Sequence, residues 1–181
     1  MNEKLDIITI GESLIELSAN EDLAEAECLN KYYGGDTLTT AVAALRAGSK
    51  VGFISRIGLD CFKNYLLESW QNEGLDISHV KPVQGINGIY IISGIKDSNS
   101  KEYSFYRKKT AAANLSIDDI SEEYIKNASI LYSTGITQSL SISAAEAVKY
   151  AFKIAKENNV TTAYDPNYSS KIWSSEEAKE A

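Results

Sequence analysis

Gly34, Gly35 and Asp36 form a short block whose residue types suit the recognition of a hydroxylated ligand. Paired glycines let the backbone approach a ligand closely, and the amides at a helix start are free to donate hydrogen bonds. The Asp36 carboxylate, like that of Glu16, adds two acceptor oxygens for hydroxyl groups. The block therefore predicts the binding of a polyol. The structural alternatives are a turn with a helix cap for the block, and a solvated surface acid for Glu16.

Arg107 is the candidate for binding an anionic group. A guanidinium group binds a planar carboxylate through two parallel hydrogen bonds. Arg107 follows the aromatic pair Phe105 and Tyr106. The alternatives are an edge-strand arginine whose charged head extends into solvent, and aromatic rings that only pack.

Apolar periodicity predicts strands alternating with helices. The run at 5–10 is β-branched and ends at Gly11, as in a strand buried on both faces. Apolar residues recur with helical spacing in 36–47, where Asp36 is the expected N-cap and Gly48 the stop. Further strands are expected at 51–57, 130–134 and 160–164. Further helices are expected at 60–72 and 143–157. Gly74 is expected to end the first of these helices, and a capping box of Ser143 and Glu146 to start the second.

This order of elements predicts an α/β fold with a doubly wound, mostly parallel sheet. A strand followed by a helix returns to the same sheet through a right-handed parallel crossover. The carboxyl ends of parallel strands meet at one edge, where ligands bind in open α/β sheets. We therefore expect Gly11, Gly58, Gly135 and Asp165 to face one crevice.

The segment 88–106 has a different pattern and predicts a β-hairpin. Its strands are expected at 90–93 and 103–106, around a polar turn at 97–100. A hairpin does not easily join a parallel sheet, so this one is a candidate lid or dimer surface. The segment 13–17 is a candidate for a neighbouring lid strand.

Composition is that of an ordinary globular domain, with 181 residues, 44% hydrophobic and 24% charged. The net charge of −7 argues against a nucleic-acid or anionic-membrane partner and favours a small molecule. No apolar run approaches the roughly 18 residues of a membrane span, and the acidic N-terminus argues against export, so we expect a cytoplasmic protein. Two cysteines and one histidine, without P-loop, HExxH or Cys-x-x-Cys motifs, predict no metal site.

The block Gly34 to Leu38, the Gly58-x-Asp60-x-Phe62 block and the Asp165 to Tyr168 block resemble the PfkB, or ribokinase-like, carbohydrate kinases, and most of all the 2-keto-3-deoxygluconate kinase branch. The resemblance implies a ribokinase-like, Rossmann-like sheet with lid strands near 12–18 and 88–107. It also implies phosphorylation of a sugar or sugar acid with ATP and Mg²⁺. It places Glu16, Gly34, Gly35, Asp36, Tyr90, Phe105, Arg107 and Gly135 at the substrate, and Asp165, Asn167 and Lys171 beside the phosphate or nucleotide.

Three positions depart from the family pattern. Ser169 stands where the family has an arginine, Thr39 where it usually has asparagine, and Lys63 where it usually has glycine. The missing arginine removes a cation for the substrate carboxylate or the transferred phosphoryl group. Either the substrate differs, Lys171 substitutes, or the activity has decayed. Arg107 favours 2-keto-3-deoxygluconate, and the alternative is fructose or another neutral sugar.

The resemblance implies that the catalytic aspartate and most of the ATP pocket belong to a C-terminal portion beyond Ala181, so no catalytic residue is assigned. We expect residues 1–181 to form the N-terminal part of a ribokinase-like kinase domain, truncated at its C-terminus. The alternatives are a non-catalytic sugar-binding or regulatory module, and one half of a split kinase whose partner chain completes the sheet. A homodimer through the lid is a further expectation.

Overall fold

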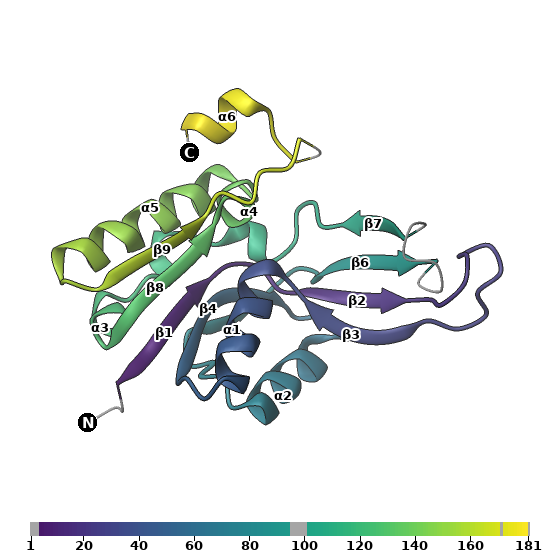
Figure 1. Ribbon diagram of the computed structural model, residues 1–181, viewed down its shortest axis with the longest axis horizontal. Coiled ribbons are helices and arrows are strands. Elements are labelled where there is room, and N and C mark those ends of the chain that lie inside the picture. Colours follow the sequence, from purple (N-terminus) through teal and green to yellow (C-terminus); the bar gives the residue numbers. More distant parts are fainter. Residues whose placement is uncertain (1–3, 95–100, 171, 181) are drawn as a thin grey trace.

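The main sheet contains five parallel strands in the order β5-β4-β1-β8-β9 (Figure 1). The computed structural model describes residues 4–94, 101–170 and 172–180. The strands of this sheet are β1 (Leu5–Ile10), β4 (Val51–Gly58), β5 (Val80–Val83), β8 (Ala128–Thr134) and β9 (Thr161–Asp165). Each neighbouring pair in this order is parallel, which confirms the predicted doubly wound α/β fold.

Helices cover both faces of this sheet (Figure 1). Successive side chains of β4 point to opposite faces, so Phe53 and Ile57 pack in one core cluster and Ile54 in the other. The helices are α1 (Asp36–Arg46) and α2 (Lys63–Glu73) on the first face, and α3 (Glu122–Lys126) and α5 (Ile142–Glu157) on the second. Shorter segments are the 3-10 turns Ala112–Asn114 and Ile117–Asp119, α4 (Gly135–Gln138) and α6 (Ser175–Glu180).

A second sheet of four strands projects from the main sheet in the order β3-β2-β6-β7 (Figure 1). Its strands β6 and β7 pair antiparallel, which confirms the predicted hairpin, and β2 pairs with β6 as its parallel neighbour. Ile15 and Ile89 anchor one face of this sheet in the core under α1 and α2. The strands are β2 (Leu14–Ser18), β3 (Asn30–Gly34), β6 (Gly88–Ser93) and β7 (Glu102–Tyr106), and the turn predicted at 97–100 lies outside the described residues.

Two predicted helix caps are wrong. The N-cap of α5 is Ser141, whose extended backbone lets Oγ accept from the Ala144 amide at 3.1 Å, while the Ser143 hydroxyl lies 3.0 Å from that of Ser141. Asp36 is the first residue of α1, because the backbone leaves the helical conformation one residue earlier, at Gly35, which is the N-cap and makes no side-chain cap hydrogen bond. The predicted stops after α1 and α2 are confirmed at Gly48 and Gly74, which have φ of +97° and +87°.

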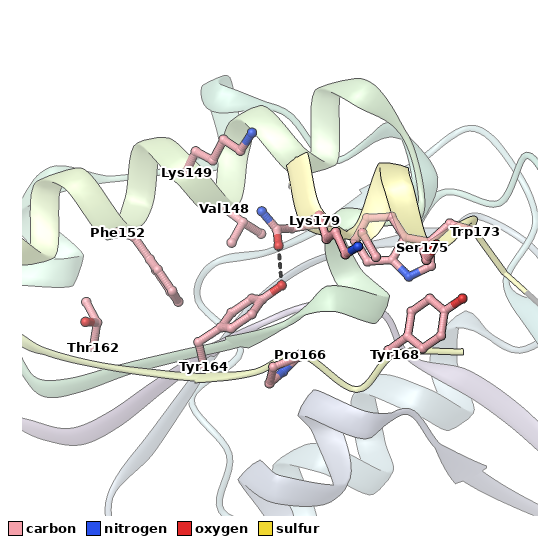
Figure 2. A pocket seen from close by; sticks show the side chains of 12 residues that line it. Val148, Lys149, Phe152, Thr162, Tyr164, Pro166, Tyr168, Trp173, Ser175 and Lys179 are labelled. Carbon is pink, nitrogen blue, oxygen red and sulfur yellow. Dashed lines mark hydrogen bonds between the residues drawn. The ribbon is translucent and has the colours of Figure 1, made fainter. Parts of the chain in front are cut away.

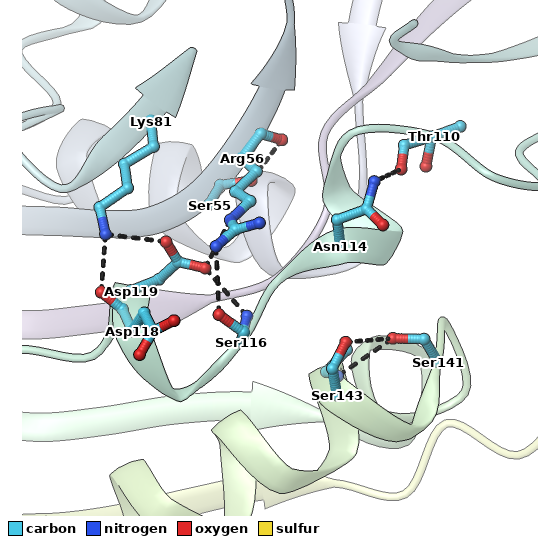
Figure 3. A network of polar contacts seen from close by, with 11 residues as sticks. Ser55, Arg56, Lys81, Thr110, Asn114, Ser116, Asp118, Asp119, Ser141 and Ser143 are labelled. Atoms are coloured by element: carbon cyan, nitrogen blue, oxygen red, sulfur yellow. Dashed lines mark hydrogen bonds and ion pairs between the residues drawn. The ribbon is translucent and has the colours of Figure 1, made fainter. Parts of the chain in front are cut away.

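The buried carboxylate of Asp119 connects residues 116–119, which follow the second sheet, to the edge of the main sheet (Figure 3). Asp119 forms ion pairs with Arg56 of β4, at 2.6 Å, and with Lys81 of β5, at 2.9 Å. Its Oδ2 also accepts from the Ser116 amide at 2.9 Å. These contacts lower the pKa of Asp119 against the opposing effect of burial, so the carboxylate stays ionised and holds residues 116–119 in place.

Candidate functional site

Asp36 brings together three segments at the carboxyl edge of the main sheet. Its Oδ2 accepts from the Thr134 hydroxyl at the end of β8, at 2.5 Å, and from the side-chain Nδ2 of Asn167 beyond β9, at 3.3 Å. Its Oδ1 accepts from the Thr37 amide at 2.8 Å. Of the predicted site residues, Asp36 and Asn167 therefore meet directly. Thr134 was missed by the sequence reasoning, and its position directly before Gly135 at a strand end is the signal that could have found it.

Two glycines of the predicted site lie where backbones pack against one another. Gly35 has φ of +126°, and a Cβ there would lie 2.3 Å from the carbonyl oxygen of Glu12. A Cβ on Gly135 would lie 2.2 Å from the carbonyl oxygen of Pro166. Any side chain at these positions would separate the segments that surround Asp36, so glycine is required for the site to close.

A row of side chains crosses the second sheet on the face opposite its buried anchor. The strand register places Glu16 of β2 beside Tyr90 of β6, and Tyr90 beside Phe105 of β7. The Tyr90 hydroxyl donates to the Glu16 carboxylate, and the Tyr90 and Phe105 rings stack at 5.7 Å. Burial and this hydrogen bond raise the pKa of Tyr90. Gly34 lies beside the row, because a Cβ there would be 2.4 Å from the Tyr90 hydroxyl oxygen.

Arg107 connects the end of the hairpin to the end of β1 through an ion pair with Glu12. Arg107 Nη2 lies 2.5 Å from Glu12 Oε2, and the two side chains are 16% and 3% exposed. Burial raises the pKa of Glu12 to about 7, while Arg107 opposes this shift and Asp36 adds to it. The sequence reasoning placed Gly11-Glu12 among the glycine-centred blocks of a sugar site but gave Glu12 no role of its own. Its place after the first strand, in Gly11-Glu12, was the available signal.

The remaining predicted residues lie at the start of the C-terminal segment. Asp165 ends β9, and its Oδ1 accepts from the backbone N–H of Asn167 at 2.9 Å; the backbone of Asn167 has φ of +39°. Lys171 lies outside the described residues.

Within residues 4–94, 101–170 and 172–180, no group of three or more His, Cys, Asp or Glu is placed to hold a metal ion.

A cavity of about 790 Å³ lies beside β9 (Figure 2). Aromatic side chains dominate its wall, and the Tyr164 hydroxyl donates to Gln138 at 2.6 Å across it (Figure 2). Its apolar wall includes Phe152, Tyr164, Tyr168, Trp173 and Val148. The cavity is mostly apolar, lies next to the last strand of the described sheet, and has two lysines, Lys149 and Lys179, in its lining.

Five parallel strands with helices on both faces, and a small second sheet that carries Tyr90 and is followed directly by Arg107, define the ribokinase-like class of α/β proteins. The chain belongs to the pfkB family of carbohydrate kinases, whose model matches residues 4–181. No helix among the described residues has the length and apolarity needed to cross a membrane.

Two curated relatives are named as kinases of sugar acids. A 5-dehydro-2-deoxygluconokinase of Clostridium beijerinckii is 33% identical over 174 residues, covering 94% of this chain and 51% of the relative. A 2-dehydro-3-deoxygluconokinase of Bacillus subtilis is 29% identical over 174 residues, covering 94% of this chain and 53% of the relative. The chain thus spans about half the length of these curated relatives.

Solved structures share the same fold. A PfkB protein from Polaromonas sp. JS666 matches with a TM-score of 0.92 and 29% identity, over 97% of this chain and 60% of the other. A putative ribokinase II from E. coli, solved in complex with ATP and Mg²⁺, matches with a TM-score of 0.85 and 23% identity, over 97% of this chain and 57% of the other. The second likeness shows the fold alone.

Proposed function

We propose that this chain forms the sugar-binding part of a kinase that phosphorylates a keto-deoxy sugar acid, with Mg²⁺-ATP as the donor. The observation that carries the proposal is Arg107, a guanidinium group held at the junction of the two sheets, next to Glu12. A carboxylate is the natural partner of such a fork. Tyr90 and Phe105 offer ring faces to the carbon skeleton, and Glu16 and Asp36 offer acceptors to its hydroxyl groups.

The two substrates that we propose are isomeric acids, and the names of the relatives support this choice. 2-Keto-3-deoxygluconate is our first choice, and 5-dehydro-2-deoxygluconate follows from the name of the 33% identical relative. Both carry a carboxylate for Arg107, and they differ in whether the keto group lies next to it or near the other end of the chain. Fructose, which lacks the carboxylate, is the neutral alternative.

Phosphoryl transfer would take place at the carboxyl edge of the main sheet. Asp165, Asn167 and Lys171 are the residues that we assign beside the phosphate or nucleotide. Transfer needs a proton acceptor and groups that stabilise the moving phosphoryl charge. Because the chain spans about half the length of its relatives, we assign the catalytic base and most of the ATP site to sequence outside it.

Thermal unfolding with each ligand tests this function. A ligand that binds only the native state stabilises it, by about 2.7 kcal/mol at 100 times its Kd. For a domain of this size we expect the preferred sugar acid to raise Tm by roughly 5–10 °C at that concentration, with fructose and Mg²⁺-ATP giving much smaller shifts. A shift with fructose and none with either acid would contradict the proposal, and a large shift with Mg²⁺-ATP would place a nucleotide site within this chain.

A homodimer through the second sheet is the quaternary structure that we propose. All five residues of β7 are exposed, and they include Tyr103, Phe105 and Tyr106. Large exposed aromatic side chains in one strand favour association with a second copy. Light scattering should give twice the 19.8 kDa chain mass, and Tyr106→Glu should lower it to one chain, while Tyr150→Glu on α5 should leave it unchanged. A monomeric mass for the unmodified chain would contradict the dimer.

A second candidate is a binding module or split kinase completed by further strands at β9. Four of the five residues of β9 are exposed, and the apolar cavity lies beside this strand. A parallel strand edge with an apolar neighbour suits extension of the sheet. We expect the C-terminal half of the Clostridium beijerinckii relative, supplied as a separate polypeptide, to bind the chain and restore phosphorylation. Binding without phosphorylation would favour the non-catalytic module.

A further inference from the structure

The ion pair between Glu12 and Arg107 leaves one carboxylate oxygen without a partner. Glu12 Oε2 contacts Arg107, whereas Oε1 is buried and has no hydrogen-bond partner among the described residues. The position of Oε1 is fixed by the close approach of β6, where a Cβ on Gly88 would lie 3.3 Å from this oxygen. A buried carboxylate normally has its oxygens paired, so this arrangement calls for a reason in the ligand-bound state.

Negative charges around Glu12 outnumber positive charges, and an anion that enters the site increases this excess. Arg107 is the cation against Glu12, and Asp36 at the start of α1 is the second acid whose charge acts on it. The third element against it, β6, contributes Gly88, which has no side chain. A substrate carboxylate on Arg107 would add a third negative charge around one guanidinium group in a site shielded from water.

We propose that binding of a sugar-acid carboxylate to Arg107 is coupled to protonation of Glu12 at Oε1. The inference rests on the proposed function, because it requires a carboxylate ligand. On binding, an O–H bond forms at Oε1 with a proton taken from the buffer, and Glu12 becomes a neutral neighbour of Arg107. The guanidinium group, which has five N–H donors, then holds the substrate carboxylate while still donating to Oε2. Glu12 is thus a positioning residue for Arg107.

Protonation of Glu12 costs little free energy near neutral pH. Burial already raises the pKa of Glu12 to about 7, so the neutral form is accessible before any ligand arrives. A further anion within a few ångströms raises a carboxylate pKa again. Linkage then requires that affinity for the acid falls as pH rises, approaching roughly tenfold per pH unit above pH 8.

Calorimetry counts the protons directly. Binding of 2-keto-3-deoxygluconate and of 5-dehydro-2-deoxygluconate is measured at pH 7 and pH 8 in PIPES, imidazole and Tris, whose ionisation enthalpies differ. The slope of the observed enthalpy against the buffer enthalpy gives the number of protons taken up. We expect net proton uptake on binding of the acid, and we expect the uptake per bound acid to rise from pH 7 to pH 8 towards one proton. Glu12→Gln should bind the acid with no proton uptake and with a Kd that does not change between pH 7 and pH 9.

Two controls separate this proposal from the proposed function. Glu25→Gln, on the exposed segment before β3, should keep the proton uptake of the unmodified chain. Binding of an acid with a proton count of zero at both pH values would overturn the coupling and leave the proposed function in place. Binding of fructose with no binding of either acid would overturn the proposed function, and the coupling with it. Uptake that persists in Glu12→Gln would place the proton on another group and would overturn the assignment to Glu12.

Discussion

Arg107→Ala is expected to weaken the binding of a keto-deoxy sugar acid about 30- to 100-fold, while changing the binding of fructose less than about threefold. A hydrogen bond to a charged group contributes roughly 1.5–3 kcal/mol, and each 1.4 kcal/mol is a tenfold change in Kd. The upper part of this range applies because the Arg107 side chain is only 16% exposed, so water screens its charge weakly. Kd measured by calorimetry for both ligands checks the prediction.

Three further variants make this result interpretable. Lys108→Ala removes an exposed positive charge next in sequence and should leave both affinities unchanged. Arg107→Lys keeps the charge but loses the planar fork, and should give an intermediate loss for the acid. Because Arg107→Ala also leaves the buried Glu12 without its cation, the double variant with Glu12→Gln separates this destabilisation from the loss of binding. An equal loss of affinity for the acid and for fructose would remove the basis for choosing an acid substrate.

Glu12→Gln is expected to stabilise the chain at alkaline pH and to change little at pH 5. The pKa of Glu12 is raised from 4.5 to about 7 on folding. A group with a raised folded-state pKa contributes stability that is fully present below its unfolded pKa and is lost as pH rises through its folded pKa. The unmodified chain therefore loses stability between about pH 5 and pH 8, by an amount on the order of 3 kcal/mol. The glutamine side chain of the variant stays neutral throughout this range, so the free energy of unfolding of the variant does not fall for this reason.

Unfolding by urea at pH 5, 7 and 9 checks this second prediction. The two free energies of unfolding should agree at pH 5 and diverge progressively above it, with the variant the more stable. Glu25→Gln, which alters an exposed acid, should follow the unmodified chain at every pH. If Glu12→Gln were the less stable protein at pH 9, the ion pair with Arg107 would outweigh the cost of burying the charge.

Repeating patterns made most of the elements predictable from sequence. β1 was predicted with its observed bounds, and β4 and the two helices on either side of it were predicted to within a few residues, because burial on a strand or a helix face imposes a short sequence period. The caps were less predictable, since Ser141 and Ser143 have the same chemistry and only the backbone conformation at Ser141 selects the cap. The strands β3 and β5 were missed, because Asn30–Gly34 is largely exposed and Val80–Val83 has only four residues.

The sequence alone determined the class of the protein and the type of chemistry that its residues suit. The glycine blocks, the acids Glu16 and Asp36, and Arg107 are local features, and in type and order they resemble those of the carbohydrate kinases, a resemblance that needs no knowledge of distances. Such features are readable because each depends on the conformational freedom or charge of a single residue.

Tertiary structure alone decided which of these groups contact one another and how burial shifts their pKa values. Glu12 and Arg107 are 95 residues apart in sequence, and the junction of two sheets brings them to 2.5 Å in a buried site. Asp36 joins Thr134 and Asn167 through similarly distant contacts. Contact across such separations, and the loss of water that shifts the pKa of Glu12, depend on the packing of the whole chain and leave no local pattern in the sequence.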